Sequence, residues 1–228
     1  MKTCFLSRGL LLPVALTAGF AMLVACDADP VRPGGTPPLT YQDLSQRAHV
    51  LNNLELAYNQ RNITQYDRLL DTNFTFFLSP GDVNGGLPAQ WGRAEELQYA
   101  SDLLDRNYPG PSLRCTGVLV NILWEEGLTW SELTPTSAPD ETWYTTTVYY
   151  GFKFEFEPNY TYIDSPGAKV RFTVRNAGTA EAPHWQLVEW YDLSEGGCLG
   201  ALGARSSTQN GREACETASW GGVKALYR

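Results

Sequence analysis

The sequence predicts an α+β domain in which three helices pack on one face of a curved antiparallel sheet. Apolar residues recur at helical spacing in three segments between residues 40 and 104, whereas from residue 115 onward they alternate with polar residues. Most strands therefore follow the helices, which is typical of an α+β layer and not of alternating βαβ units. Antiparallel strands with one solvent-facing side need helices on the other side.

Three helices are predicted, over residues 40–58, 63–70 and 94–104. The first begins with Thr40 and Asp43 in the spacing of a capping box. Its predicted apolar face comprises Leu44, Ala48, Leu51, Leu54 and Tyr58. The third helix carries two glutamates near its positive N-terminal end. Its predicted buried face comprises Ala94, Leu97, Ser101 and Leu104.

Five strands are predicted, over residues 74–78, 115–124, 142–157, 169–175 and 184–193. In the longest strand Phe152, Phe154 and Phe156 share one face, and charged residues occupy the other. Glycines and a proline between residues 81 and 88 predict a loop. Residues 219–227 are interpreted as an extra strand or a flap.

The first 26 residues have the plan of a bacterial export signal. Lys2 and Arg8 form a short basic region, and residues 9–24 are apolar and uncharged. The run Leu23-Val24-Ala25-Cys26 resembles the lipobox of bacterial lipoproteins. The resemblance implies cleavage after residue 25, acylation of Cys26 and anchoring to the bilayer of the cell envelope, at the inner or the outer membrane. An ordinary cleaved signal with an incidental cysteine is the alternative.

Residues 26–41 are rich in proline and glycine and are predicted to form a tether. The whole chain has a formal charge of −8, and removal of residues 1–25, which hold Lys2 and Arg8 and no acid, makes it −10. We expect no nucleic-acid partner, because phosphates repel an acidic protein. Aromatic residues make up 12% of the chain, which is enough to build a core.

Three cysteines remain between the tether and the C-terminus. Export to an oxidising compartment favours a disulfide. We predict the pair Cys198–Cys215, which closes a glycine- and serine-rich stretch and stabilises by about 3 kcal/mol in the chain-entropy model. Cys115 is then expected to be a buried free thiol at the start of a strand. Only two histidines and no Cys-x-x-Cys spacing are present, so we expect neither a metal site nor a cofactor.

The order helix, helix, strand, helix and then long antiparallel strands resembles the nuclear transport factor 2-like fold, which includes ketosteroid isomerases, scytalone dehydratase and SnoaL-like cyclases. The resemblance covers about residues 42–194 and leaves residues 195–228 as a C-terminal extension. Four segments carry it: VLNNLELAY (50–58), YDRLLDTNFTF (66–76), GRAEEL (92–97) and HWQLVEWYD (184–192). It implies a curved sheet around an apolar cavity that serves catalysis, ligand binding or partner contact, so the fold alone does not choose a function.

An isomerase or dehydratase of this fold needs a cavity carboxylate or histidine with a tyrosine donor, because burial raises a carboxyl pKa and suits it to proton transfer. The candidates here are Glu189, Asp192, Tyr58 and Tyr149. Strict alternation would turn Glu189 inward, whereas a bulge would turn Trp190 inward and leave Glu189 in water, and we predict the bulge. Asp192 is expected to cap the strand end. The candidate pocket residues are Tyr58, Trp91, Phe152 and Trp190.

We therefore predict an exported, lipid-anchored protein whose single domain binds a small apolar ligand or a protein partner, because no catalytic set transfers from the family. The alternative is a SnoaL-like lyase or isomerase acting on an apolar ring compound, with an inward Glu189 or Asp192 near a tyrosine. A third hypothesis is an envelope scaffold that forms a homodimer through the outer face of the sheet.

Overall fold

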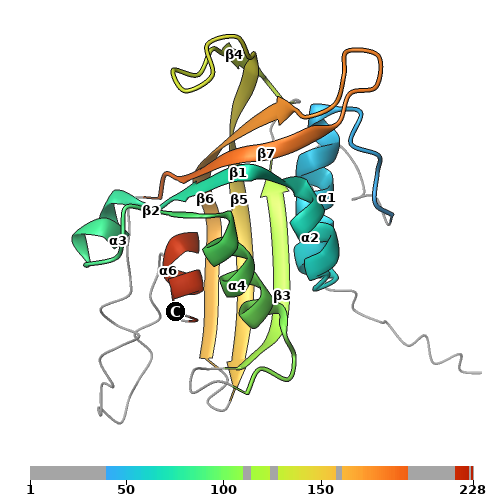
Figure 1. Ribbon diagram of the computed structural model, residues 1–228. Helices are drawn as coiled ribbons and strands as arrows, with labels where there is room; N and C mark the ends of the chain where they lie inside the picture. Colours follow the sequence, from blue (N-terminus) through green and yellow to red (C-terminus); the bar gives the residue numbers. More distant parts are fainter. Residues whose placement is uncertain are drawn as a thin grey trace, which may run out of the picture. The chain divides into compact units, whose positions relative to one another are not determined.

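A computed structural model describes residues 40–109, 114–123, 128–157, 161–194, 219–225 and 227 (Figure 1). All of them belong to one compact unit, residues 32–228. The predicted signal peptide, Cys26, the tether up to residue 39 and the pair Cys198–Cys215 lie outside the described residues. Within the described part of the chain, no helix is long and apolar enough to cross a membrane.

The first helix, α1 (Arg47–Asn59), begins later than predicted. The capping box expected at Thr40 and Asp43 is wrong, because Gln46 is the residue that precedes the helix. The Asp43 carboxylate instead accepts a hydrogen bond from the Ser45 backbone at 3.2 Å. A short acidic side chain that bonds its own backbone neighbours stabilises a turn in competition with a helix. The buried face therefore begins only at Val50.

Two further helices cover the region between residues 63 and 84. Helix α2 (Ile63–Leu69) confirms the prediction and is capped by Asn62, whose side chain accepts a hydrogen bond from the Gln65 backbone at 3.1 Å. Helix α3 (Pro80–Asn84) occupies part of the segment that was predicted to be a loop. Ser79 caps it, and its proline occupies a first-turn position where a missing N–H costs nothing.

Helix α4 (Arg93–Leu104) lies where it was predicted, but it buries a different face. The buried residues are Glu96, Ala100, Leu103 and Leu104, whereas Ala94 and Ser101 are exposed. The prediction was wrong because it placed only apolar and small side chains inside. Buried partners, described below, hold the Glu96 carboxylate in the interior and so set the rotation of the helix.

Seven strands form one sheet: β1 (Leu70–Phe77), β2 (Gln90–Gly92), β3 (Arg114–Leu123), β4 (Ser131–Leu133), β5 (Trp143–Glu157), β6 (Thr161–Asn176) and β7 (Trp185–Asp192). The strand order is β2-β1-β7-β6-β5-β3, and β4 pairs with β5. The described strands pair antiparallel except β1 and β7, which are parallel. The sheet is thus mixed rather than wholly antiparallel, and β2 and β4 are additional to the predicted strands.

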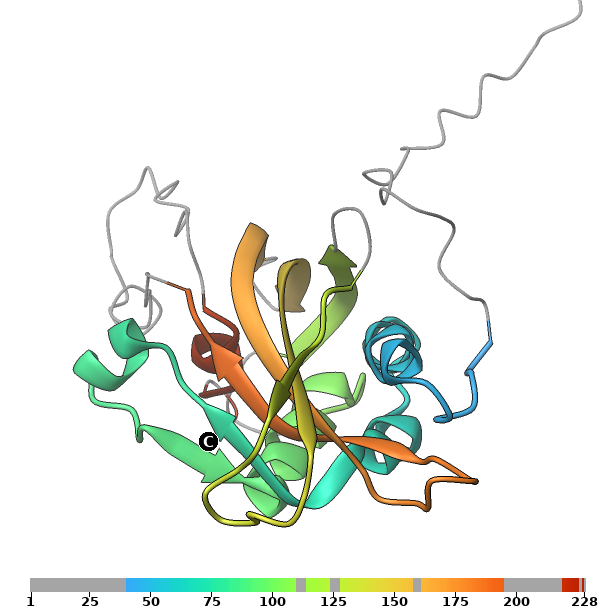
Figure 2. The same ribbon diagram turned by 90° about the horizontal axis from the view of Figure 1, so that it is seen from above.

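The inner face of the sheet carries the predicted alternation. Phe152, Phe154 and Phe156 of β5 are at most 2% exposed, and Val170, Phe172 and Val174 of β6 at most 1%. Cys115 is buried and free at the start of β3, as predicted. Helices α1 and α4 both pack against this face, with α1 on β3 and β7 and α4 on β1, β2 and β3 (Figures 1 and 2).

The C-terminal segment does not form the expected strand or flap. Residues Trp220–Ala225 form a short helix, α6, which lies beside α4 on the inner side of the sheet (Figures 1 and 2). Trp220 and Val223 are 1% exposed and belong to the same core as the inner faces of the strands. The folded domain that was predicted to end at residue 194 therefore includes this helix.

Candidate functional site

The interior of the domain is walled by aromatic rings, and the Trp220 ring of α6 lies among them. Trp220 is stacked on Trp190 of β7 with ring centroids 5.3 Å apart, and it meets Tyr58 of α1 edge-on at 4.8 Å. Tyr150, Phe152 and Phe154 of β5 lie at 5.5, 5.2 and 5.4 Å. Three of the four predicted pocket residues, Tyr58, Phe152 and Trp190, thus contact the Trp220 ring, which comes from near the C-terminus of the chain.

Lys224 of α6 places its ammonium group in a cage of rings and one carboxylate. Its side chain is fully buried and forms an ion pair with Glu96 of α4, which is also fully buried. Its Nζ lies 4.5 Å from the ring centroids of Phe76 and Trp190 and 5.2 Å from that of Trp220. These distances fall within the range of cation–π attraction. Burial lowers the pKa of Lys224 to about 8, and the neighbouring Glu96 charge opposes this effect.

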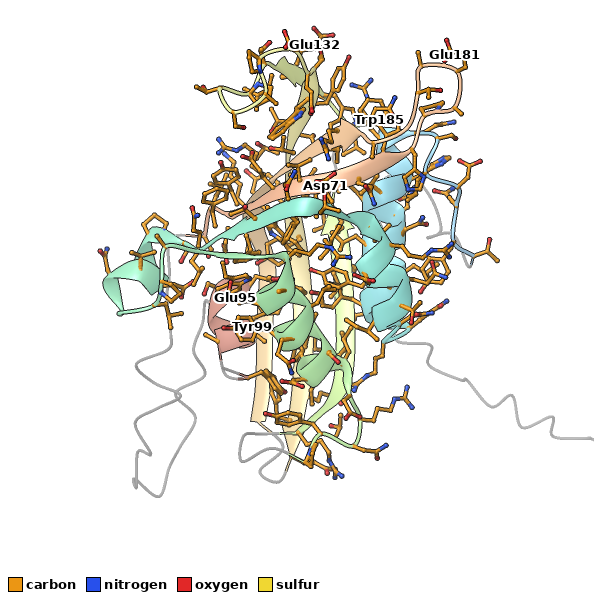
Figure 3. The ribbon with its side chains drawn as sticks, in the orientation of Figure 1. Asp71, Glu95, Tyr99, Glu132, Glu181 and Trp185 are labelled. Carbon is orange, nitrogen blue, oxygen red and sulfur yellow. The ribbon has the colours of Figure 1, made fainter. Side chains whose placement is uncertain are left out.

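The Glu96 carboxylate has two further hydrogen-bond donors from the domain itself. The Tyr66 hydroxyl donates to Oε1, and the Trp91 indole Nε1 donates to Oε2 at 2.8 Å. Burial and the negative charge of Glu96 raise the pKa of Tyr66 well above its usual value, so Tyr66 stays protonated and remains a donor. Trp91, the fourth predicted pocket residue, stacks on Phe76 at 4.8 Å and meets Tyr99 edge-on at 5.1 Å (Tyr99 is labelled in Figure 3).

Two aspartates hold the N-terminal end of α6. The Ser219 hydroxyl lies 2.7 and 2.6 Å from the two carboxylate oxygens of Asp82, which also accepts a hydrogen bond from Ser79 at 2.9 Å. The Gly221 N–H donates to Oδ2 of Asp192 at 3.1 Å. A Cβ at Gly221 would lie 3.0 Å from Oδ2 of Asp82, which explains why a glycine occupies this close approach. Burial raises the pKa of Asp82.

Seven buried side-chain polar atoms in the described part of the chain make no hydrogen bond of standard geometry, and four of them lie around α6. They are the hydroxyls of Tyr58 and Tyr150 and the indole nitrogens of Trp190 and Trp220. Such groups are rare in protein interiors, because each one loses its hydrogen bonds to water on burial. The Tyr58 hydroxyl lies near the side chains of Tyr66 and Trp220, and the Tyr150 hydroxyl lies near the Trp220 backbone, so these groups interact with their neighbours without well-formed hydrogen bonds.

The structure separates the predicted catalytic residues onto two sides of the sheet. A bulge places Val188 of β7 as an extra residue, since Thr173 pairs with Glu189 while Val174 pairs with Leu187. Trp190 is therefore buried in the interior, and Glu189 lies on the outer face, as the predicted bulge requires. Its side chain borders two outer-face cavities of about 500 and 390 Å³.

The other candidates are divided in the same way. Tyr149 is 47% exposed on β5, whereas Tyr58 is fully buried in the interior. Asp192 is 2% exposed and caps the end of β7, where it accepts hydrogen bonds from the Ser194 backbone at 3.0 Å and hydroxyl at 2.6 Å. The negative charge of Asp192 adds to burial in raising the pKa of Tyr150. An inward carboxylate near a tyrosine is thus present at Asp192, not at Glu189.

Sequence reasoning missed Glu96, Lys224 and Asp82. Glu96 was interpreted as a charge near a helix N-terminus, and residues 219–227 were interpreted by their apolar and glycine content alone. The segment Trp220-Gly-Gly-Val-Lys224 does carry a signal, because a tryptophan and a lysine four residues apart lie on one face of a helix. Nothing local to that segment reveals that both side chains face the interior.

Comparison of this chain with known proteins finds solved structures that are similar at low sequence identity. The sequence matches no protein-family model and no curated protein. Similar structures include a conserved protein from Planctomyces limnophilus, with 12% identity and a TM-score of 0.44 over 64% of this chain and 91% of that chain. ActVI-ORFA from Streptomyces coelicolor has 13% identity and a TM-score of 0.42 over 65% and 93% of the two chains.

A nuclear transport factor 2-like superfamily protein from Salmonella enterica has 9% identity and a TM-score of 0.42 over 65% and 89% of the two chains. The helices packed against a curved, mostly antiparallel sheet form the arrangement that the nuclear transport factor 2-like resemblance of the sequence predicts. At these low identities and TM-scores, no activity passes from these proteins to this chain. The function must therefore be argued from the interior and from α6.

Proposed function

We propose that this chain is an exported lipoprotein, anchored through acylated Cys26, whose nuclear transport factor 2-like domain binds a small, largely apolar ligand in the interior that α6 occupies. One observation carries the proposal: apolar ring walls surround a few buried polar groups of the domain, among them the Tyr58 and Tyr150 hydroxyls, that make no hydrogen bond of standard geometry to α6. Apolar walls with a few convergent polar groups are the usual composition of a small-molecule site. A ligand that satisfies these groups has an advantage that the helix lacks.

Helix α6 is suited to exchange with a ligand. It has six residues, two of them glycines, and isolated helices of that length do not persist in water. Its place in the domain therefore depends on tertiary contacts alone, chiefly those of Trp220, Lys224 and the Ser219 hydroxyl. Because a tethered segment has a high effective concentration, a free ligand must bind tightly to compete with it.

The geometry supports binding over the alternative of a lyase or isomerase. Glu189 lies outside the interior, and the Asp192 carboxylate already accepts hydrogen bonds from Ser194 and Gly221. The one observation in favour of proton transfer is that Asp192 lies near the buried Tyr150. If the domain is an enzyme, Asp192→Asn removes turnover of the ligand, whereas Glu189→Gln leaves it unchanged.

Native mass spectrometry of the full chain, purified in mild detergent, tests ligand binding. We expect a reproducible extra mass that is lost on denaturation, and more of it in Trp220→Ala, which weakens the competing helix. Trp130→Ala, a partly buried tryptophan outside this interior, is the matched control. A bare mass in both wild type and Trp220→Ala overturns the ligand proposal, and a bare mass of twice the monomer supports the homodimer scaffold instead.

Labelling of growing cells with radioactive palmitate tests the anchor. We expect label in the wild-type chain and in Cys115→Ser, but none in Cys26→Ser. The Cys26→Ser chain is also expected to lose its association with membranes, because acyl chains supply the anchoring energy. Equal labelling of the wild type and Cys26→Ser would refute acylation at this position.

A further inference from the structure

The side chain of Lys224 shows which chemical group the interior is built to hold. Its ammonium is completely removed from solvent, which carries a large desolvation cost for any charged group. The domain offsets this cost with the Glu96 carboxylate and with the rings of Phe76 and Trp190, whose centroids both lie 4.5 Å from Nζ. Rings and a carboxylate around one cation are a recognition site for ammonium groups.

The charges around this position favour a cation over other ligand classes. Asp82, Glu96 and Asp192 all lie buried around α6, and Lys224 is the one buried cation among the described residues. If α6 leaves, three carboxylates remain in a low-dielectric interior without a positive charge. An anionic ligand is repelled there, and a neutral ligand leaves Glu96 without the cation that compensates for its burial.

We propose that the interior recognises a primary alkylammonium group, which takes the place of the Lys224 side chain between Glu96 and the rings of Phe76 and Trp190. This inference rests on the proposed function, since it names the chemical class of the ligand that competes with α6. The group carries an N–H, because a donor must reach Oε1 of Glu96 as Lys224 does, and a primary group is chosen because it reproduces the Lys224 ammonium in size and donors. The remainder of the ligand is largely apolar, since the stem of Lys224 and the Trp220 ring occupy that space, with polar atoms only where it meets the Tyr58 and Tyr150 hydroxyls.

Chemical rescue of Lys224→Ala in the full chain tests the recognition step. The substitution removes three methylene groups and the amine, and propylammonium contains the same atoms. We expect propylammonium chloride at ten times its dissociation constant to raise the melting temperature of Lys224→Ala by about 3–6 °C. The wild type, whose cage is filled, is expected to shift by less than 1 °C at the same concentration (about the uncertainty of such scans).

Three controls separate recognition of a cation from filling of a hole. Propanol has the same shape without the charge, and tetramethylammonium chloride has the charge without an N–H donor, so both are expected to be at least tenfold weaker. In the double variant Lys224→Ala with Glu96→Gln, propylammonium is expected to lose its effect. Equal rescue by propanol, or no rescue in a folded Lys224→Ala, overturns the proposal. If Lys224→Ala does not fold alone, the readout becomes recovery of folding with added propylammonium.

The two proposals fail in distinguishable ways. If native mass spectrometry finds an adduct without an amine, ligand binding stands and the ammonium inference is overturned. If propylammonium rescues Lys224→Ala while neither wild type nor Trp220→Ala carries an adduct, the cage recognises ammonium but serves the protein's own helix, and the ligand proposal is overturned. An amine in the adduct together with selective rescue supports both.

Discussion

The buried pair of Lys224 and Glu96 gives the sharpest test of how α6 is held. Lys224→Met keeps the length of the stem and removes the charge, so a buried carboxylate is left with only the Tyr66 and Trp91 donors. Loss of one partner of a buried ion pair costs about 3–5 kcal/mol. Glu96→Gln leaves the buried ammonium without its carboxylate and has a cost of similar size.

A double-mutant cycle separates the pair from everything else that these side chains touch. Because the double variant buries neither charge, we expect its cost to be about 3 kcal/mol less than the sum of the two single costs. Urea unfolding followed by tryptophan fluorescence measures all four chains, since Trp220 and Trp190 lie beside the pair. Additivity of the two single costs within about 0.5 kcal/mol would refute the conclusion that the pair acts as a unit.

The buried Lys224 ammonium also makes the free energy of unfolding depend on pH, and comparison with Lys224→Met isolates this effect. The pKa of Lys224 is about 8 in the folded chain and 10.5 when the group is exposed, so the unfolded chain holds this proton more tightly. The cost of burying the charge is fully present below pH 8 and is relieved as the pH rises towards 10.5. The free energy of unfolding of the wild type should therefore rise by about 2 kcal/mol between pH 7 and 9.5, relative to Lys224→Met. A parallel pH dependence of the two chains contradicts this account.

Three further predictions concern other parts of the domain. Trp220→Ala removes the ring that fills the interior and should lower the free energy of unfolding by about 3–5 kcal/mol in urea titrations. An unchanged free energy of unfolding would show that the ring contributes no packing energy. Arg175→Ala leaves the Asp71 carboxylate, 1% exposed and bonded at 2.6 Å, without its cation and should cost about 2 kcal/mol, whereas exposed Arg114→Ala should cost under about 1 kcal/mol; equal costs would show that burial is irrelevant here. Burial raises the pKa of Cys115 to about 11, so a thiol reagent at pH 8 should modify it only after denaturant is added, and labelling of the folded chain would contradict this.

The fold could be predicted from the sequence because its longest elements carry their own periodicity. The alternation of phenylalanines in β5 and of valines and Phe172 in β6 specifies an inner face without reference to any other segment. The bulge at Val188 was predictable for the same reason, because only an extra residue turns Leu187 and Trp190 inward together. Short elements such as α3, β2 and β4 have too few residues to show a period.

The site could not be predicted because its polar residues find partners far away in the chain. Glu96 and Lys224 are 128 residues apart, and Asp82 and Ser219 are 137 apart. A charged residue on a helix is normally interpreted as solvent-facing, since burial of one charge alone is unfavourable. Such a residue is buried only when another segment supplies the opposite charge. The local sequence pattern carries no information about that partner.

The arrangement of these distant pairs also explains why α6 forms a helix at all. Its six residues contain two glycines, which local propensity disfavours in a helix. The Asp82–Ser219 and Asp192–Gly221 contacts position its first turn, and the Glu96–Lys224 pair fixes its last turn, so polar contacts at both ends set its register while Trp220 fills the space between them. A segment held by a few directional contacts is specific in position but carries little local stability of its own. It follows that a ligand which supplies one ammonium and one apolar ring reproduces most of what holds α6 in place.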